Sequence, residues 1–574
     1  MAKINLVIDG NKVSVNEGTT VLDAAKSVGV DIPTLCYFKD LNDIGACRIC
    51  VVEIEGQPRL NAACNTLCEE GMVVHTNSAR VRRAREVNLK LILSKHEGYC
   101  PTCPRNHNCK LQTLAEEFNI LDEPYERTPK QMAWDGSMPF IKRDDKCIMC
   151  MRCIEVCDKV QTANVWDLIG TGSHSRVGVA NGGTLTEAGC AMCGQCVTHC
   201  PVGALAERDD TKKFFDAIED PNKTVVVQVA PAVRSAWGDG LGLDPKLATE
   251  KRMAAAMRRL GADYVFDTNF TADLTIMEEG SEFIERMTHP GEYKMPMFTS
   301  CCPGWVRFVK LYYPEFVNNL STAKSPQQMF GAVAKTYFAE KIGKTAEDIF
   351  CVSIMPCTAK KYECDVPEVN DASDKDVDMV LTTREFDKLL KMLRVDAAKL
   401  PEEDFDSPLG SGTGAAVIFG ATGGVMEAAL RSAYYLITGE NVDADAFQEV
   451  RGLWGWRDAK FKAGDIEVRV AIASGLGNAR ALLEEVKAGK AEYDFIEIMA
   501  CPGGCAGGGG QPIEDGEELA GVRKERLYDI DKNNKLRRSH ENTDVLTMYE
   551  EYFEKPLSHK SHKLLHTKQE DWSL

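Results

Sequence analysis

Two cysteine runs with the same spacing constrain the fold of this 574-residue chain more than any other feature. Both runs read C-x2-C-x2-C-x3-C, and they contain Cys147, Cys150, Cys153 and Cys157, then Cys190, Cys193, Cys196 and Cys200. Three thiolates at this spacing can reach three corners of one iron-sulfur cube, and the fourth serves the other cube. We therefore expect Cys200 to complete the first site and Cys157 the second. Paired zinc sites are the alternative.

A different cysteine group lies nearer the amino terminus. Its members are Cys36, Cys47, Cys50 and Cys64, spaced C-x10-C-x2-C-x13-C. Before them, "INLVIDGNKVSV" predicts a hairpin that turns at Gly10 and Asn11, and "TVLDAAKSVGV" has helical spacing. This order resembles the plant-type two-iron ferredoxin fold, with the usual four-residue first interval lengthened to ten. A zinc knuckle is the alternative, and Cys68 is expected to be a packed thiol rather than a ligand.

A third group mixes histidine with cysteine in "HEGYCPTCPRNHNC". It contains His96, Cys100, Cys103 and Cys109. Alone, these residue types fit a zinc site with three cysteine ligands and one histidine, but the neighbouring cysteine groups favour a four-iron cluster. A histidine in place of a thiolate removes negative charge and should raise the reduction potential of such a cluster. The stretch that precedes it, 77–96, predicts a helix that ends at His96.

Composition limits the classes of function. The net charge of −18 argues against nucleic acid or an anionic membrane as the main partner. No stretch approaches the roughly 18 apolar residues of a membrane span, and "MAKINLVIDG" does not resemble a signal peptide. We therefore expect a cytoplasmic protein, where a reducing environment makes the 23 cysteines metal ligands before disulfides.

From about residue 210 onward, short apolar runs alternate with helical stretches. The runs are "KTVVVQVAP", "ADYVFDTN", "MPMFTSC", "DIFCVSIMP", "VDMVLTT", "EVRVAIASG" and "YDFIEIMAC". This alternation predicts an α/β region with mainly parallel sheets, arranged as two similar lobes, whose ligands gather at the carboxyl ends of the strands. Five thiols follow strands directly: Cys301, Cys302, Cys357, Cys501 and Cys505. Four of them can hold a cubane, and one is left over.

The segment "MACPGGCAGGGGQP" joins two of these cysteines to six glycines. Glycines at 503, 504 and 507–510 would let the backbone approach a bulky inorganic group and donate amide hydrogen bonds to it. A phosphate-binding loop is the alternative, but the Lys-Ser/Thr pair of such loops does not follow the glycines.

The motifs "TSCCPGW", "MPCTAKK" and "MACPGGCAGGGGQ", in this order, resemble the three signature motifs of the iron-iron hydrogenases. The cluster motifs before them resemble those of the large monomeric clostridial type. The resemblance implies a multidomain α/β protein with β-grasp and ferredoxin-like domains before a two-lobed catalytic domain. The implied domains are a 2Fe-2S domain at 1–78, a 4Fe-4S domain with histidine and cysteine ligands at 79–125, a double 4Fe-4S domain at 126–209 and the catalytic domain at 210–574.

The resemblance also implies the roles of individual residues around the active-site cluster. Cys302, Cys357, Cys501 and Cys505 match the ligands of a cubane, and Cys505 matches the thiolate that bridges to a two-iron subsite carrying carbonyl, cyanide and an azadithiolate. Lys360 matches the residue that donates a hydrogen bond to cyanide. A buried ammonium requires an anionic acceptor, which agrees with this role; without the family, a surface lysine would be the better interpretation. The pocket positions matched are Met355, Met499, Gln327 and Phe419.

The leftover thiol, Cys301, matches the family's proton donor to the bridging amine. Glu279, Glu282, Ser321 and Arg286 match the proton path that continues from it. Carboxylates three residues apart share a helix face, so a relay is geometrically reasonable, although a solvated face is the commoner meaning of such a pair. Ala232 stands where some members of the family have serine. Cys351 and Cys364 match no role, and we expect Cys364 to be a packed thiol.

The expected activity is that of a ferredoxin hydrogenase, which reversibly reduces protons to hydrogen. The implied cofactors are one 2Fe-2S cluster, three accessory 4Fe-4S clusters and the six-iron active-site cluster. Ferredoxin or flavodoxin would be the electron partner, maturation proteins would supply the two-iron subsite, and the chain is expected to act as a monomer. Arg80, Arg82, Arg83 and Arg85 form either a basic docking patch or a solvated helix face. The alternatives are a redox-sensing homologue with little turnover and a pure electron-transfer subunit.

Overall fold

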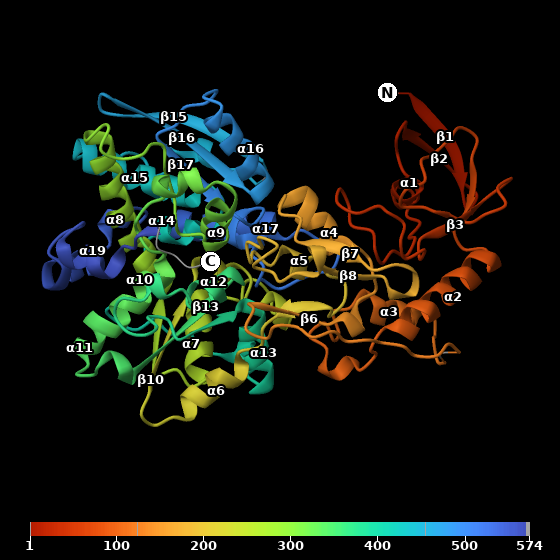
Figure 1. The fold of residues 1–574 in the computed structure, drawn as a ribbon, viewed down its shortest axis with the longest axis horizontal. Helices are drawn as coiled ribbons and strands as arrows, with labels where there is room; N and C mark the ends of the chain where they lie inside the picture. Colours follow the sequence, from red (N-terminus) through yellow and green to blue (C-terminus); the bar gives the residue numbers. More distant parts are fainter. Residues whose placement is uncertain (1, 123, 454, 570–574) are drawn as a thin grey trace.

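The chain extends from a small amino-terminal part to a larger body in the computed structural model, which describes residues 2–122, 124–453 and 455–569 (Figure 1). In Figure 1 the red and orange segments lie on one side, the green and blue segments form the larger body on the other, and α4 (Arg152–Glu155) and α5 (Gln195–Thr198) lie between them. The order of the chain in space therefore follows its order in sequence from the first domain to the catalytic region.

A five-stranded sheet, ordered β2-β1-β5-β3-β4, forms the first domain. Asp9 and Gly10 occupy the hairpin turn with φ of 46° and 84°, and Asn11 already belongs to β2. The turn predicted at Gly10 and Asn11 was therefore wrong by one residue, because left-handed geometry at two adjacent positions favours Asp-Gly. The elements are β1 (Lys3–Ile8), β2 (Asn11–Asn16), α1 (Val21–Ser27), β3 (Val51–Ile54), β4 (Asn61–Ala62) and β5 (Val73–His75).

The helix expected before His96 is α2 (Ala79–Lys95), with Ser78 as its amino-terminal cap and His96 as its carboxyl-terminal cap residue. Arg85 on this helix is buried and donates a hydrogen bond to the carbonyl of Val51 at 2.8 Å. The patch of four arginines was therefore wrong in one member, because the face of α2 that carries Arg85 packs on the first domain.

The two cysteine repeats fold alike. In each repeat, a short helix starts directly after a residue with left-handed backbone geometry. This residue is Met151 before α4, with φ of 65°, and Gly194 before α5, with φ of 73°. Two small antiparallel sheets, β6-β9 and β7-β8, flank these helices. The elements are α3 (Lys110–Glu117), β6 (Phe140–Lys142), α4 (Arg152–Glu155), β7 (Trp166–Ile169), β8 (Arg176–Val179), α5 (Gln195–Thr198) and β9 (Leu205–Glu207).

Two four-stranded sheets carry the catalytic region. The strands of the first, β11-β10-β13-β14, are all parallel, and in the second, β12-β17-β16-β15, only β15 runs antiparallel to its neighbour. The expectation of a two-lobed region with mainly parallel sheets is confirmed. The strands are β10 (Thr224–Val229), β11 (Tyr264–Asp267), β12 (Met297–Phe298), β13 (Ile349–Met355), β14 (Met379–Thr382), β15 (Trp456–Ala463), β16 (Ile466–Ser474) and β17 (Phe495–Met499).

Helices cover both sheets and explain why the central strands are apolar on both faces. The longest, α8 (Thr268–Thr288), is capped by the Asp267 side chain, which accepts from the amide of Asn269, and most of its residues are buried. The other helices up to the second sheet are α6 (Thr211–Glu219), α7 (Glu250–Arg259), α9 (Pro303–Tyr312), α10 (Pro326–Val333), α11 (Ala339–Lys341), α12 (Ala359–Glu363), α13 (Thr383–Met392), α14 (Gly414–Val417), α15 (Gly424–Thr438) and α16 (Leu476–Lys487).

The last elements wrap back onto the catalytic region. They are α17 (Ala520–Asn533), α18 (Thr543–Met548) and α19 (His559–Leu565), and α19 packs against α10 (Figure 1). None of the helices in the described part of the chain combines the length and apolarity that a bilayer crossing requires.

Candidate active site and iron-sulfur sites

A cavity of about 80 Å³ lies where the carboxyl ends of β10, β13 and β17 meet the start of α9. Strand ends that are far apart in the sequence meet here because β10 and β13 run parallel in one sheet and β17 of the other sheet ends at the same cavity. All five thiols predicted for the active site line this cavity, together with the five other matched pocket positions. These residues are Cys301, Cys302, Cys357, Cys501, Cys505, Lys360, Met355, Met499, Gln327 and Phe419.

Burial controls the chemistry of these thiols. It raises the pKa of Cys357 to about 12 and that of Cys501 well above its usual range, and neighbouring thiols add to both rises. The amide of Ala500 also donates to the Cys302 sulfur at 3.4 Å. Several thiolates can share such a site only when a positive partner compensates their charge. The donor set therefore fits an iron-sulfur cluster held by Cys302, Cys357, Cys501 and Cys505.

Lys360 reaches the cavity from α12 with its ammonium already paired. It donates to the Glu363 carboxylate at 2.7 Å and to the carbonyl of Cys301 at 3.1 Å. The anionic acceptor that a buried ammonium requires is thus supplied by the protein, so the burial of Lys360 does not by itself call for cyanide. A lysine has three N–H donors, which leaves one for a ligand in the cavity.

Glu363 was missed by the sequence analysis. Its side chain is buried, and it also accepts from the Ser325 hydroxyl at 2.9 Å and the Gln327 amide at 3.1 Å. The signal was present as the i, i+3 spacing of Lys360 and Glu363 in "AKKYE". Glu363 fixes the orientation of two residues that line the cavity.

Two glycines after Cys505 have a packing reason beside the expected approach to a cluster. A β-carbon at Gly508 would lie 2.1 Å from the carbonyl oxygen of Pro356, and one at Gly509 would lie 2.5 Å from that of Cys193. Side chains are excluded here because three backbone segments pass each other closely. The glycines bring the loop of β17 against the loop of β13 and against the second cysteine repeat, and Gly504 and Gly508 also line the cavity.

The proposed proton path begins beside the cavity. Burial raises the pKa of Cys301 well above its usual range, and the nearby charge of Glu279 raises it further. Glu279 lies on α8, is buried, and its two carboxylate oxygens have no hydrogen-bond partner among the described residues. Burial, with the charge of Glu282 second, raises the pKa of Glu279 to about 8. A carboxyl group with this pKa can both hold and release a proton near neutrality.

The outer half of the path is fully hydrogen-bonded. The Ser321 hydroxyl donates to Glu282 at 2.9 Å, and the amide of Thr322 donates to the same carboxylate at 3.0 Å. Arg286, one helical turn further along α8, pairs with Glu282 at 2.5 Å. The structure therefore brings together all five residues that the resemblance assigned to proton transfer, and Thr322 joins them.

The eight repeat cysteines separate into two groups in the pattern expected. A small cavity is lined by Cys147, Cys150, Cys153 and Cys200, so the last cysteine of the second repeat joins the first three of the first repeat. Conversely, the charges that raise the pKa of Cys196, after burial, come from Cys193, Cys190 and Cys157. The first set of four thiols surrounds a space that fits one cubane, and the thiols of the second set lie close enough to raise each other's pKa.

His96 is buried, and one of its ring nitrogens is held by a backbone carbonyl. Its Nδ1 lies 2.9 Å from the carbonyl oxygen of Lys146, which leaves Nε2 free, and burial lowers the pKa of its imidazole. A ligating histidine commonly has its other ring nitrogen fixed in this way. Cys100 lies on the turn just beyond, and the charge of Cys103 acts on Cys109.

In the first domain the four cysteines approach one another in pairs. The amide of Cys36 donates to the Cys47 sulfur at 3.4 Å, and a hydrogen bond between the Cys50 and Cys64 side chains is the largest influence on the pKa of each. Cys68 lies outside these pairs, is buried, and has its pKa raised to about 11 by burial. These positions fit four ligands of a two-iron cluster and one packed thiol.

Direct contacts connect the cluster sites in series. The Asn42 amide donates both to the carbonyl of Cys36 at 2.7 Å and to that of Cys150 at 2.9 Å, which joins the first domain to the first cubane site. At the other end, the Cys501 sulfur lies 3.8 Å from the carbonyl oxygen of Cys193. The second cubane site is therefore in contact with the active-site cavity. The first contacts the first domain through Asn42, and His96 lies against Lys146, the residue before Cys147.

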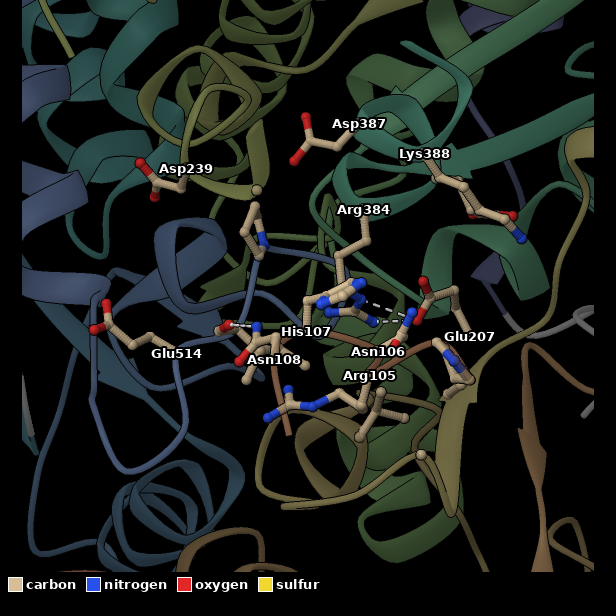
Figure 2. A pocket seen from close by; sticks show the side chains of 18 of the residues that line it. Arg105, Asn106, His107, Asn108, Glu207, Asp239, Arg384, Asp387, Lys388 and Glu514 are labelled. Atoms are coloured by element: carbon tan, nitrogen blue, oxygen red, sulfur yellow. Dashed lines mark hydrogen bonds and ion pairs between the residues drawn. The ribbon is translucent and has the colours of Figure 1, made fainter. Parts of the chain in front are cut away.

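A much larger cavity, of about 1310 Å³, is lined both by residues of the cluster domains and by residues of the catalytic region (Figure 2). Several of its charged side chains pair with each other, as Arg384 does with Glu207 at 2.6 Å. Arg105 differs: it is buried, and its guanidinium has no hydrogen-bond partner among the described residues. Burial lowers the pKa of Arg105, and the charges of Asp515, then of Cys200 and Cys109, oppose this shift. A donor left unpaired between two cluster sites fits clusters whose sulfur atoms accept its hydrogen bonds.

Three residues named in the sequence analysis without a ligand role, Cys351, Cys364 and Ala232, are packed in the catalytic region. Cys351 and Cys364 are buried in the core of the first catalytic sheet, and burial raises the pKa of Cys364 to about 12. Ala232 lines the active-site cavity, and its carbonyl accepts from the Gln511 amide at 3.0 Å. All 23 cysteines, which lie within the described residues, are free of disulfides.

Comparison with known families agrees with this geometry. Residues 223–509 match the iron only hydrogenase large subunit, C-terminal domain, and residues 517–571 match the iron hydrogenase small subunit. The earlier part matches three iron-sulfur domains: a 2Fe-2S cluster binding domain at 1–79, the NADH-ubiquinone oxidoreductase-G iron-sulfur binding region at 85–124 and the ferredoxin-like domain of NADH-quinone oxidoreductase subunit 3 at 138–206.

Similar proteins cover nearly the whole chain. The NADP-reducing hydrogenase subunit HndD of Solidesulfovibrio fructosivorans is 50% identical over 99% of both chains. Iron hydrogenase 1 of Clostridium pasteurianum is 38% identical over 98% of this chain and 99% of its own. A solved structure of a variant of the FeFe-hydrogenase HydA1 from Chlamydomonas reinhardtii is 44% identical, has a TM-score of 0.57, and covers 62% of this chain and 98% of its own. With the matched domains and the thiol-lined cavity, these likenesses show that the chain belongs to the iron-only, or FeFe, hydrogenase family and is a hydrogenase with iron-sulfur domains.

Proposed function

We propose that this hydrogenase reversibly reduces protons to hydrogen with electrons from reduced ferredoxin or flavodoxin, as a ferredoxin hydrogenase. One observation carries the proposal: five thiols, Lys360 and both matched methionines line one cavity that contacts a cubane site through Cys501, and the charge of the buried Glu279 carboxylate acts on Cys301 in its wall. Such a cavity has separate routes for electrons and protons, which proton reduction requires.

The active-site cluster would be held by Cys302, Cys357, Cys501 and Cys505, with Cys505 bridging to a two-iron subsite supplied by maturation proteins. When bound, this cluster supplies the electrons that convert protons to hydrogen. The accessory clusters would be one 2Fe-2S and three 4Fe-4S clusters, held by the sixteen cysteine and histidine positions of the first three domains. Arg105 would compensate the negative charge of the two clusters beside it.

The residues of the chain itself would move the proton. The Cys301 thiol holds a proton at the cavity wall, and Glu279, with its pKa near 8, exchanges protons with it. Ser321 passes protons between Glu279 and Glu282 by rotating its hydroxyl, because it already donates to Glu282. Arg286 stabilises the Glu282 carboxylate at the outer end. Met355, Met499, Gln327 and Phe419 would line the site and exclude water.

A second candidate concerns the electron partner. The relative that is 50% identical is named as a subunit of an NADP-reducing hydrogenase. By that likeness, this chain would exchange electrons with a partner subunit that reduces NADP, rather than with a free ferredoxin, and it would not act as a monomer. The catalytic chemistry proposed for the cavity is the same in both cases.

A direct test uses the purified chain under strict anaerobiosis, after maturation. We expect hydrogen evolution from reduced methyl viologen and from reduced ferredoxin. Evolution with the dye but not with ferredoxin or flavodoxin would favour the NADP-linked subunit, which a purification of the chain from its native cells with its bound partners would then identify. No evolution with the dye, with the full iron content present, would contradict the catalytic proposal and favour a redox sensor.

We further propose that the protein works in the cytoplasm. All 23 cysteines are free, as thiols are in a reducing compartment. Fractionation of the native cells with activity measured in each fraction tests this location, and activity confined to a periplasmic fraction would contradict it.

A further inference from the structure

The carboxyl-terminal segment 565–569 lies against the loop that carries Ser321. The amide of Lys324 donates to the carbonyl of Leu565 at 2.8 Å, and the amide of Thr567 donates to the carbonyl of Thr322 at 2.8 Å. Between these two bonds, Ala323 and His566 form an antiparallel bridge. The two segments therefore pair as short strands do, although more than 240 residues separate them in the sequence.

Side chains add to this pairing at both of its ends. The Gln569 amide donates to the carbonyl of Ser321 at 2.9 Å, and the Lys310 ammonium donates to the carbonyl of Gln569. The Ser300 hydroxyl donates to the carbonyl of Ala323 at 2.6 Å. Because Ser300 directly precedes Cys301, the same loop contacts the inner and the outer parts of the proton path.

His566 joins this loop to the helix that carries both path glutamates. Its Nδ1 lies 2.8 Å from the Thr322 hydroxyl, and its Nε2 lies 3.0 Å from the Glu278 carboxylate. Glu278 precedes Glu279 on α8, is fully buried, and also accepts from the Tyr549 hydroxyl at 2.6 Å. His566 is itself buried, so both of its contacts are shielded from water.

We infer that the segment 565–569 is a positioning element of the proton path, and that His566 is its central positioning residue, because it holds Thr322 and Ser321 at hydrogen-bonding distance from Glu282. This inference rests on the proposed proton path. None of the residues 565–569 touches the active-site cavity, so they would act only through the loop. A displacement of about 1 Å in such a path can slow a reaction as much as 10²-fold, so a loosened loop should have a large effect on proton transfer.

Two substitutions remove the link from either side. His566→Gln removes the ring that spans Glu278 and Thr322, and Thr322→Val removes only the hydroxyl while its backbone amide still donates to Glu282. Thr322→Ser restores the hydroxyl. Thr567→Val is the matched control, because Thr567 is about as buried as His566 and its hydroxyl donates to the carbonyl of Glu368, away from the path.

The experiment measures hydrogen evolution in H2O and D2O for the matured full chain, with infrared spectra of bound carbonyl and cyanide and iron content in parallel. We expect His566→Gln and Thr322→Val to lower turnover by about tenfold and to raise the solvent isotope effect, since proton transfer becomes the slowest step. The infrared bands and iron content should not change. Thr322→Ser and Thr567→Val should keep both the turnover and the isotope effect of the unchanged chain.

The inference is overturned if both link variants match Thr567→Val in turnover and isotope effect. It is also overturned if their turnover falls only in proportion to lost iron, because the segment would then serve stability alone. If His566→Gln does not fold, Thr322→Val decides. An unchanged chain that evolves no hydrogen would instead refute the proposed function, which separates the two failures.

Discussion

The electron side and the proton side of this molecule are built in opposite ways. On the electron side, three of the four thiols of the first cubane site, Cys147, Cys150 and Cys153, lie on one short segment, and only Cys200 comes from the second repeat. On the proton side, Ser321 meets Glu282 across 39 residues, and His566 meets Thr322 across 244. Electrons pass between clusters that need only be near each other, whereas a proton moves along hydrogen bonds whose lengths must be held. The comparison teaches that the proton side depends far more on how the chain is packed.

The largest expected effect comes from removing the two-iron subsite, where the electron side and the proton side meet. A chain made without maturation proteins should lack the two-iron subsite and lose all hydrogen turnover, while its iron falls from about twenty to about eighteen atoms per chain. The accessory clusters should keep their paramagnetic resonance signals, because their ligands lie elsewhere. Iron analysis and the spectra after reduction check this. Stoichiometric zinc in anaerobically purified protein would contradict the assignment of His96 as a ligand of a four-iron cluster.

The next effect concerns the proton side alone. Cys301→Ala should lower turnover in both directions by more than about 10²-fold, because a positioned acid-base group is lost. The infrared bands of carbonyl and cyanide should stay in place, since Cys301 is not among the four ligands. Cys301→Asp should retain more activity, and Cys302→Ala should lose the cluster signature itself. Near-normal turnover of Cys301→Ala with an intact cluster would rule out the path through Glu279.

A smaller expected effect on the proton side is the pH dependence of hydrogen evolution. The pKa of Glu279 is raised to about 8, so its carboxyl keeps its proton below that pH and gives it up above. Hydrogen evolution needs the protonated group and should fall as pH rises through about 8. Glu279→Gln should lower turnover by roughly 10²-fold and abolish this inflection. Turnover against pH, measured with the electron supply in excess, checks the result, and an unchanged inflection in the variant would assign it to another group.

The smallest effect concerns the electron side. Arg105→Gln removes a buried positive charge near Cys109 and Cys200, which should lower the reduction potentials of the neighbouring clusters because their reduced forms carry more negative charge. Removing one unit charge from beside a cluster should lower its reduction potential by some tens of millivolts. Turnover should change less than about twofold, in contrast to the proton-side variants. Redox titration followed by paramagnetic resonance tests this, and Arg105→Lys, which keeps the charge, should restore the potentials.

The parts of the molecule that could be predicted from the sequence are those that depend on local residue patterns. The strands that lead to Cys301, Cys357 and Cys501 were found because buried parallel strands are continuous apolar runs. The cluster ligands were found because their spacing is local. The hairpin turn at Asp9 and the buried Arg85 were misread, since one depended on backbone dihedrals and the other on which helix face is covered.

The sequence by itself determined the cluster motifs, the α/β class and the family, because each of these is written in residue types at short, fixed intervals. Only the tertiary structure decided that Glu363 neutralises Lys360, that glycines 508 and 509 exclude side chains to admit other backbone, and that the carboxyl-terminal segment holds Ser321. Those contacts join residues that are not spaced in the chain by any regular pattern. Their formation depends on burial and on hydrogen bonds completed only when distant segments pack together.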